Sequence, residues 1–146
     1  MTTTHQADIV RQAVAAIWNH GDLTVADALF TPTYRNHYGL ITDAVHGPEA
    51  IKVSVALFRL AFPALHITVD ELIAAPDRVV VRWTARAGGT PTAASDTLTG
   101  MTICRLSGAA IAESWTYWDQ ERVLRQLSRI VAQEHADDAW PCPSST

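Results

Sequence analysis

Apolar residues recur at helical spacing in three segments of the first half of the chain. In the first segment they form one stripe, which contains Ile9, Val10, Ala13, Val14, Ile17 and Trp18. Residues at such intervals lie on one face of an α-helix, so we expect a helix that begins at Asp8. A short helix is expected over residues 22–29, and a longer one over residues 48–62, which starts with one proline and stops before another. Residues 34–38 are polar and aromatic, and residues 39–47 read as a loop.

From Leu65 onward the apolar residues recur at every second position, which is typical of β-strands. The alternation breaks at Asp70, where we expect a β-bulge. Apolar residues occur on both faces of the strand over residues 79–86, so we expect it to be buried over much of both. A final helix is expected over residues 120–132, where helical spacing returns. The predicted strands cover residues 65–74, 79–86, 98–106 and 109–119.

The predicted order is therefore three helices, a run of antiparallel strands and one final helix. Helices gathered on one side of an antiparallel sheet define the α+β class. We predict a cone-shaped, curved antiparallel sheet that packs against the N-terminal helices, with a C-terminal helix and one open mouth. A single domain is expected over residues 8–132, with a disordered N-terminus at residues 1–7 and a loose tail at residues 133–146.

Composition narrows the classes of function that fit the chain. Hydrophobic residues make up 48% and charged residues 18% of the 146 residues, so we expect one globular domain with a substantial core. The net charge of −4 and the lack of basic clusters argue against nucleic acid and anionic membranes as partners. No signal peptide and no apolar run of ~18 residues is visible, so we expect a soluble cytoplasmic protein.

The sequence shows no cofactor or metal site. Its two cysteines, Cys104 and Cys142, do not form a disulfide framework or a metal-binding knuckle. No set of His, Asp, Glu and Cys has the spacing of metal ligands, and neither a glycine-rich phosphate loop nor a nucleophile elbow occurs. We therefore expect a protein that works without a cofactor or a metal.

Asp119 is the main candidate for a catalytic residue. It lies where the last strand passes into the last helix, and an unbroken strand would place Trp115, Tyr117 and Asp119 on one face. A carboxylate among aromatic side chains is costly to ionise, and such a group can act as a general acid near neutral pH. The alternative role is structural, because Asp just before an apolar-periodic segment is a favoured helix N-cap.

Four stretches of the chain, in order, resemble one known family. Together they span roughly residues 8–130. The stretches are Trp18-Asn19-His20-Gly21-Asp22, Tyr34-Arg35-Asn36-His37, the segment from Gly47-Pro48-Glu49 to Phe62-Pro63-Ala64-Leu65, and Ala112-Glu113-Ser114-Trp115-Thr116-Tyr117-Trp118-Asp119. They are similar to the SnoaL-like polyketide cyclases of the nuclear transport factor 2-like superfamily. The resemblance implies an α+β barrel with an apolar cavity, and a homodimer formed through the sheet.

The resemblance also implies roles for individual residues. Asp119 matches the acid/base of the family's intramolecular aldol ring closure. Asn36 and His37 match polar positions at the cavity mouth, where the amide would bind a substrate carbonyl and the imidazole would carry a proton. Trp115 and Tyr117 share the predicted face of Asp119 and would line the pocket, with the tyrosine hydroxyl donating to a carbonyl oxygen.

Two further residues complete the predicted substrate-binding set. Thr102 lies on the strand before the last, where the family carries polar groups. Trp83 and Arg82 point to opposite faces of their strand, and the sequence leaves open which one faces the cavity.

The expected function is a cofactor-independent cyclase of polyketide biosynthesis that closes a ring in a largely apolar small molecule. Acid/base chemistry and the holding of a reactive conformer would both contribute. The alternatives are another tailoring enzyme on the same scaffold (a hydroxylase, isomerase, dehydratase or epoxide hydrolase) or a non-catalytic ligand-binding or dimerisation module.

Overall fold

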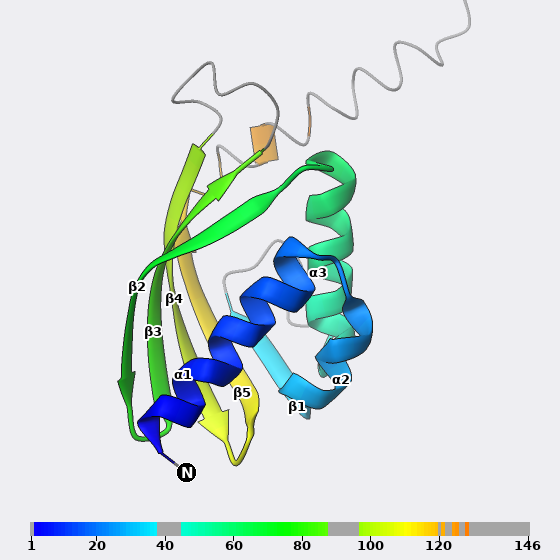
Figure 1. Cartoon of the computed structure of the whole chain (residues 1–146). Coiled ribbons are helices and arrows are strands. Elements are labelled where there is room, and N and C mark those ends of the chain that lie inside the picture. The colour runs from blue at the N-terminus through cyan, green and yellow to red at the C-terminus, as the bar shows by residue number, and fades with distance from the viewer. Residues whose placement is uncertain are drawn as a thin grey trace, which may run out of the picture.

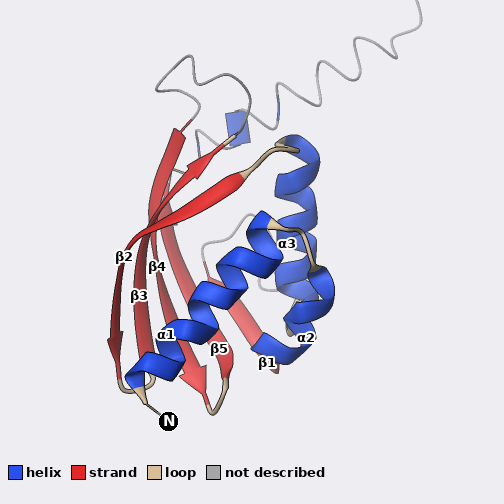
Figure 2. Cartoon of the chain, in the orientation of Figure 1, coloured by secondary structure: helices blue, strands red, loops and turns tan. Residues whose placement is uncertain are grey.

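Within the residues that the structure describes, three helices lie on one side of a five-stranded sheet that curls around them without closing (Figure 1). The computed structural model describes residues 2–37, 45–87 and 97–119, and also residues 121, 124, 125 and 128. The separation of helices from strands is also clear in Figure 2 and confirms the predicted α+β class. The elements are α1 (Thr3–Gln12), α2 (Ala26–Leu29), α3 (Pro48–Ala61), β1 (Phe30–His37), β2 (His66–Ala75), β3 (Arg78–Arg86), β4 (Thr97–Ser107) and β5 (Ala110–Trp118).

The first helix begins at Thr3 and therefore earlier than the predicted start at Asp8. Thr2 caps it, because its side-chain oxygen accepts a hydrogen bond from the backbone N–H of His5 at 3.2 Å. Residues 3–7, which we expected to be disordered, thus form the first turns of α1. The apolar pattern could not reveal these turns, since they are largely polar. Beyond Gln12 the helix continues as a π-helical segment (Ala13–Asn19).

The second and third helices lie where the sequence predicts them. Asp22 accepts a hydrogen bond from the backbone N–H of Thr24 at 3.2 Å and so caps the 3₁₀ turn that precedes α2. Gly47 directly precedes α3 with a φ of 76°, and a Cβ there would lie 2.6 Å from the carbonyl oxygen of Pro32. Glycine is therefore required where the start of α3 packs against β1.

The strand β1 was not predicted. It contains Pro32, and we interpreted residues 34–38 as an irregular polar segment between helices. In the structure β1 lies at one edge of the sheet and pairs in parallel with β5, so that Asn36 lies opposite Ser114. An edge strand tolerates proline, and its pairing partner lies far away in sequence, so local alternation did not reveal it. The sheet is consequently not antiparallel throughout.

The strand order is β1-β5-β4-β3-β2, and every pair other than β1–β5 is antiparallel. The predicted bulge in β2 is confirmed by a register shift between Val69 and Glu71. The prediction that β3 is buried on both faces is wrong, because Val79 and Val81 are buried whereas Arg82 is exposed. One face of the sheet packs against the helices and the other faces outward, as is common for antiparallel sheets.

The end of the π-helical segment forms hydrogen bonds with the edge strand β2 and with α3. The side chain of Asn19 donates from Nδ2 to the carbonyl of Ile67 at 2.9 Å and accepts at Oδ1 from the Ile67 N–H at 2.7 Å. Arg59 of α3 donates from Nη1 to the carbonyls of Trp18 and Asn19, at 2.8 and 3.0 Å. These contacts hold the helices and β2 around one interior space.

The predicted last helix is described only in part. Residues 121, 124, 125 and 128 are helical, in agreement with the prediction. The other residues of the predicted helix, the tail at 133–146, most of the predicted loop at 39–47 and the connection at 88–96 lie outside the described residues.

Candidate functional site

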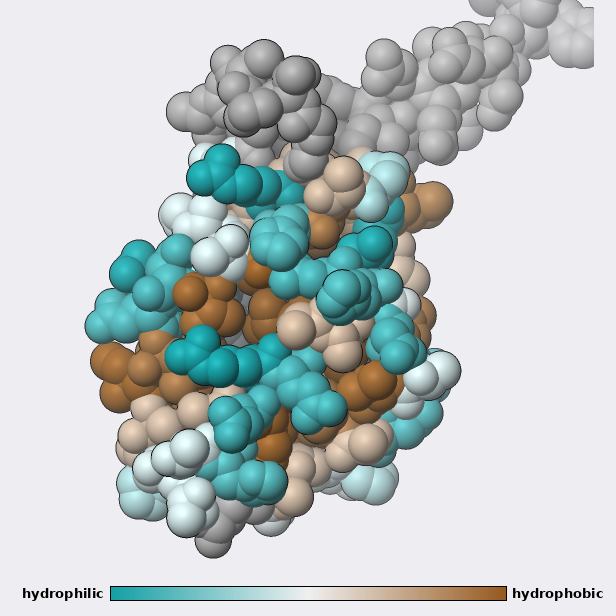
Figure 3. All heavy atoms as spheres, viewed as in Figure 1, coloured by the Kyte–Doolittle hydropathy of each residue, from teal (hydrophilic) through white to brown (hydrophobic). Residues whose placement is uncertain are grey.

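A cavity of about 310 Å³ lies between the helices and the inner face of the sheet. This volume suits a small organic molecule. Among the described residues that line the cavity, none carries a charged side chain. Apolar side chains also show between bands of hydrophilic ones on the face seen in Figure 3. The cavity therefore favours a neutral and largely apolar ligand, because a buried charge without a partner is costly.

Aromatic side chains form one part of the cavity wall. The ring of Phe58 on α3 lies 5.6 Å from that of Trp18 and 5.2 Å from that of Trp118, measured between centroids. The Trp118 ring in turn lies 6.4 Å from that of Trp83 on β3. Gly100 of β4 lies opposite Trp83 and leaves room for its indole, because a Cβ there would lie 2.3 Å from Cζ2. The result is an apolar wall that suits a ring-containing ligand.

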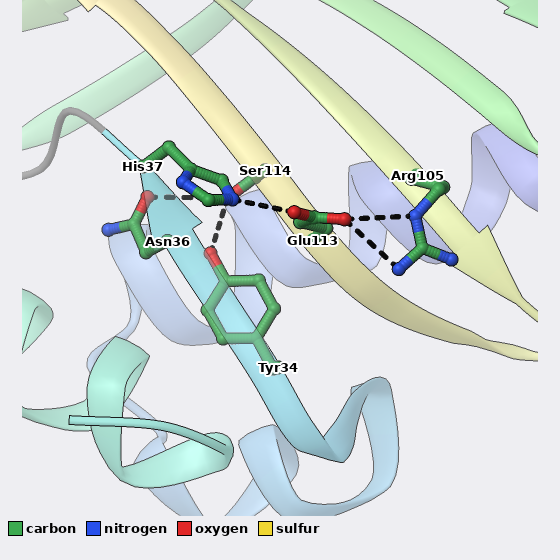
Figure 4. Close-up of polar contacts among 6 residues, drawn as sticks. All are labelled: Tyr34, Asn36, His37, Arg105, Glu113 and Ser114. Atoms are coloured by element: carbon green, nitrogen blue, oxygen red, sulfur yellow. Dashed lines mark hydrogen bonds and ion pairs between the residues drawn. The ribbon is translucent and has the colours of Figure 1, made fainter. Parts of the chain in front are cut away.

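Tyr34, Ser114 and Asn36 form a chain of hydrogen bonds between β1 and β5 (Figure 4). The Tyr34 hydroxyl bonds to the Ser114 hydroxyl, which donates to Oδ1 of Asn36 at 3.3 Å. Burial raises the pKa of Tyr34 above its ordinary value, more than the Ser114 hydrogen bond lowers it. The phenol therefore stays neutral near physiological pH. All three residues line the cavity.

A second chain joins Trp83, Thr102 and Thr116, which lie on three neighbouring strands. The indole Nε1–H of Trp83 donates to Thr102 Oγ1 at 3.0 Å. The hydroxyl oxygens of Thr102 and Thr116 are 3.1 Å apart and share a hydrogen bond. All three residues line the cavity, so polar groups occur at two places in an otherwise apolar wall.

Nucleophilic chemistry at Cys104 finds little support in this cavity. Cys104 lines the cavity, but burial raises the pKa of its thiol to about 12, so little nucleophilic thiolate exists near neutral pH.

Within the described ranges, no group of three or more His, Cys, Asp and Glu side chains is placed to hold a metal ion. In the same part of the chain, no helix is long and apolar enough to cross a membrane.

A bulge in β5 decides which of its residues face the cavity. Arg105 and Leu106 are neighbours on β4, yet they pair with Glu113 and Ile111, so Ala112 is an extra residue on β5. The extra residue shifts the alternation of side chains by one position. The residues of β5 beyond the bulge that line the cavity are Ser114, Thr116 and Trp118.

The predicted site residues are therefore divided between the two faces of the sheet. Asn36, Trp83 and Thr102 line the cavity, and the open question about Trp83 is answered. Trp115 and Tyr117 do not line it and alternate with the residues that do. Their expected position on the cavity face depended on an unbroken strand.

His37 lies with Trp115 on the outward face of the sheet. There it belongs to a hydrogen-bonded group with Glu113 and Arg105 (Figure 4). Its Nε2 bonds to Oε2 of Glu113 at 2.6 Å, and its ring stacks on that of Trp115 at 5.1 Å between centroids. Arg105 donates from Nε and Nη2 to Oε1 of Glu113, both at 3.1 Å. The hydrogen bond from His37, assisted by Arg105, holds the pKa of Glu113 below its ordinary value. These contacts join β1 to β5 from outside the cavity.

Asp119 directly follows β5 and is exposed. It is not among the residues that line the cavity, although its neighbour Trp118 is. Its roles as an acid/base and as a helix cap both stay predictions.

Several polar and aromatic residues of the cavity lining were not among the predicted site residues, and they include Tyr34, Ser114, Thr116 and Trp118. The sequence did contain one signal for the residues of β5. Alternation along this strand is just as regular for Ser114, Thr116 and Trp118 as for Trp115 and Tyr117, which we expected in the pocket. Alternation alone does not say which of two faces is inside. Tyr34 lay in a segment where no strand was expected.

The sequence model of the SnoaL-like polyketide cyclase family matches residues 8–127 of the chain. The chain belongs to this family. The resemblance that four short stretches indicated is thereby confirmed. A search of curated proteins gave no significant match to this SnoaL-like chain.

Solved structures share the fold of this SnoaL-like protein. A protein from Bacillus cereus ATCC 10987, with an inferred polyketide cyclase activity, is 19% identical with a TM-score of 0.71, over 86% of this chain and 81% of that one. AclR from Streptomyces galilaeus, an inferred hydroxylase, is 19% identical with a TM-score of 0.64. The similarity covers 88% of this chain and 98% of that chain. A Catenulispora acidiphila protein with a ketosteroid isomerase-like fold, in complex with trimethylamine, is 22% identical with a TM-score of 0.62, over 82% and 92%. At these identities the similarity establishes the fold.

Proposed function

We propose that this protein is a cofactor-independent tailoring enzyme of secondary metabolism that closes a ring in a neutral, largely apolar, polyketide-type substrate. The observation that carries the proposal is an apolar cavity whose wall holds two chains of hydrogen-bonded side chains. Membership of the SnoaL-like family supports a tailoring role, as do solved relatives with inferred cyclase and hydroxylase activities.

The cavity suits the chemical demands of an aldol ring closure. A base removes a proton from a carbon beside one carbonyl, the enolate attacks a second carbonyl of the same molecule, and the new alkoxide takes up a proton. Negative charge therefore develops on oxygen, and hydrogen-bond donors aimed at that oxygen lower the barrier. Asn36 and Thr102 would contribute such polar contacts. The aromatic wall would hold the folded conformer in which the two carbons meet.

Asp119 is the proposed acid/base. In support of this role, Asp119 directly follows Trp118, which lines the cavity, and Asp119 itself is exposed. It would remove the carbon-bound proton and return one to the alkoxide. General acid–base catalysis typically contributes about 100-fold to 10,000-fold to a rate.

The test is turnover of poly-β-carbonyl substrates, followed by chromatography and mass spectrometry. A cyclase forms an isomer of the substrate, or its dehydrated product, whereas a hydroxylase adds one oxygen atom. Asp119→Asn and Asp119→Ala are expected to lose turnover by about 100-fold or more. Asp8→Asn, which alters an exposed carboxylate on α1, is the matched control and should not change turnover. Full turnover in both Asp119 variants would remove Asp119 from the mechanism and leave conformational positioning as the catalytic effect.

A non-catalytic ligand-binding module is the second candidate. The observation in its favour is that no charged side chain occurs among the described residues of the cavity wall. Thermal stabilisation by a ligand that is recovered chemically unchanged would support this alternative, whereas conversion of the ligand would exclude it.

We also propose that the protein forms a homodimer through the outward face of its sheet. Met101 and Tyr117 are paired across β4 and β5 and are 42% and 53% exposed, so apolar surface is available there. Light scattering should give a dimer mass for the wild type and a monomer mass for Met101→Lys combined with Tyr117→Lys. Leu60→Lys, at a residue of α3 that is 77% exposed, is the control and should remain dimeric. A wild type that is monomeric at high concentration would contradict the proposal.

A further inference from the structure

We propose that His37 is a positioning residue, which holds the Asn36 amide in place at the cavity wall from the opposite face of the sheet. The two residues are neighbours at the end of β1, and Asn36 lines the cavity whereas His37 lies outside it. The expected effect on turnover rests on the proposed function, in which Asn36 contacts the oxygen where charge develops. The expected effect on the Asn36 amide itself is independent of that function.

The regular pairing of β1 with the rest of the sheet is concentrated at its C-terminal end. In the described sheet, β1 is an edge strand that pairs with β5. Their parallel register is irregular between Phe30 and Arg35, and successive pairs follow at Arg35, Asn36 and His37. Parallel pairing is slightly less stable per residue than antiparallel pairing. Side-chain bonds at this end of β1 therefore have a large influence on where the Asn36 backbone lies.

Side-chain hydrogen bonds join β1 to β5 on both faces of the sheet at this end (Figure 4). On the inner face, the Ser114 hydroxyl donates to Oδ1 of Asn36 at 3.3 Å. On the outward face, Nε2 of His37 bonds to Oε2 of Glu113 at 2.6 Å. Glu113 and Ser114 are neighbours on β5, just as Asn36 and His37 are neighbours on β1. The shorter outer bond thus restrains the same two backbone segments that the longer inner bond joins.

The acceptor of the outer bond is itself held in place. Arg105 of the interior strand β4 donates to Oε1 of Glu113 from Nε and Nη2, both at 3.1 Å. The His37 ring is also stacked on that of Trp115, with 10° between the two planes. The side chains of His37 and Glu113 are only 22% and 21% exposed, so water weakens their bond less than it weakens a surface ion pair. The end of β1 is thereby linked, through Glu113, to β4.

A direct chemical role for His37 in the cavity does not fit this arrangement. Its ring lies against Trp115, and it is not among the residues that line the cavity. Its Nε2 is already engaged by Glu113. His37 acts on the cavity through the backbone that it shares with Asn36, because a shift of the last residue of β1 moves the residue before it.

The test uses substitutions that separate the hydrogen bond of His37 from its ring stacking. His37→Gln keeps a side-chain N–H donor at a similar reach and loses the ring. His37→Phe keeps a ring against Trp115 and loses the donor. Glu113→Leu removes the acceptor and should have the same effect as His37→Phe. His5→Phe, at an exposed histidine of α1, is the matched control.

The first measurement is NMR of the asparagine side-chain amides, labelled with ¹⁵N. Asn19 and Asn36 are the only asparagines in the sequence, so each side-chain signal is readily assigned. Asn19 is an internal standard, because its amide bonds to Ile67 on β2, at the other edge of the sheet. His37→Phe is expected to shift the Asn36 signal and to leave the Asn19 signal unchanged. His37→Gln and His5→Phe should give the wild-type spectrum.

The second measurement is turnover of a poly-β-carbonyl compound. His37→Phe should lower kcat by about tenfold to 100-fold with little change in KM, because a misplaced polar contact is lost mainly in the transition state. His37→Gln should restore kcat.

An unchanged Asn36 signal in His37→Phe or in Glu113→Leu would overturn the proposal. Equal changes in the Asn19 and Asn36 signals would also overturn it, since they would indicate a general loss of structure. If the wild type turns over no poly-β-carbonyl compound, the proposed function fails, whereas the NMR comparison still decides the role of His37.

Discussion

The indole of Trp83 lies directly against the backbone of Gly100, where a Cβ would come within 2.3 Å of Cζ2. The two residues are partners in the neighbouring strands β3 and β4. The missing side chain at residue 100 lets the indole reach over β4 and donate to Thr102 at 3.0 Å. The size of residue 100 therefore controls both the aromatic wall and the second hydrogen-bond chain.

We predict that Gly100→Ala displaces the Trp83 indole and breaks its hydrogen bond to Thr102. The expected loss is about 1–3 kcal/mol in the free energy of unfolding, as for other overpacked interiors. Denaturant unfolding measures this loss, and a change in tryptophan fluorescence reports the displacement. Trp83→Phe removes the indole atoms that would clash, so the double variant should be destabilised by less than the sum of the single changes.

The control for this prediction is Thr99→Ala, which shortens an exposed side chain of the same strand. It should change the free energy of unfolding little. Strict additivity of Gly100→Ala and Trp83→Phe would show that the contact between the two residues is not the cause.

A second prediction concerns the buried bond between Tyr34 and Ser114, which connects β1 to β5 across 80 positions of sequence. Ser114→Ala leaves the buried phenol without its partner and should cost about 1–3 kcal/mol, whereas Tyr34→Phe should cost about 1 kcal/mol. The double variant should cost less than the sum, because it removes both members of the bond. Chemical denaturation of the wild type, the two single variants and the double variant gives the coupling energy between the two residues. A coupling energy of zero would contradict the assigned bond.

A third prediction concerns pH. Glu113 has a pKa below its ordinary value of 4.5, mainly because of the hydrogen bond from His37. Its contribution to stability is therefore complete above pH 4.5 and is lost as the pH falls through the lower folded-state pKa. The free energy of unfolding of the wild type should fall more steeply than that of Glu113→Gln between about pH 5 and about pH 3. Because the group is partly exposed, salt should reduce the difference. If the free energies of unfolding of the two proteins fell equally with pH, the assigned contribution of Glu113 to stability would be refuted.

A fourth prediction concerns the amide of Asn19, which bonds both the N–H and the carbonyl of Ile67. Asn19→Ala should lower the free energy of unfolding by about 1–2 kcal/mol and speed hydrogen exchange at the Ile67 amide. Asn19→Asp keeps an acceptor for the Ile67 N–H but loses the donor to its carbonyl. It should therefore retain more of the exchange protection than the alanine variant. Equal exchange in all three proteins would show that Asn19 does not hold this edge of the sheet.

The candidate site was only partly predictable from the sequence. Asn36, Trp83 and Thr102 line the cavity as expected, but Ser114, Thr116 and Trp118 take the places that alternation had assigned to Trp115 and Tyr117. The cause is one extra residue, Ala112, which shifts the side chains of β5 to opposite faces. Residues of both faces of β5 include aromatic and polar side chains, so hydrophobicity did not distinguish the inner face from the outer one.

By itself, the sequence determined the helices, most strands and the family of this protein. The spacing at which apolar residues recur indicates whether a segment is a helix or a strand and which of its sides is apolar. This spacing is a local property of the chain. Only the tertiary structure decided that β1 joins the sheet beside β5, that Tyr34 meets Ser114, and that His37 turns to the outward face. Each of these depends on the pairing of segments far apart in sequence, and pairing sets the register and the face of every side chain in a sheet.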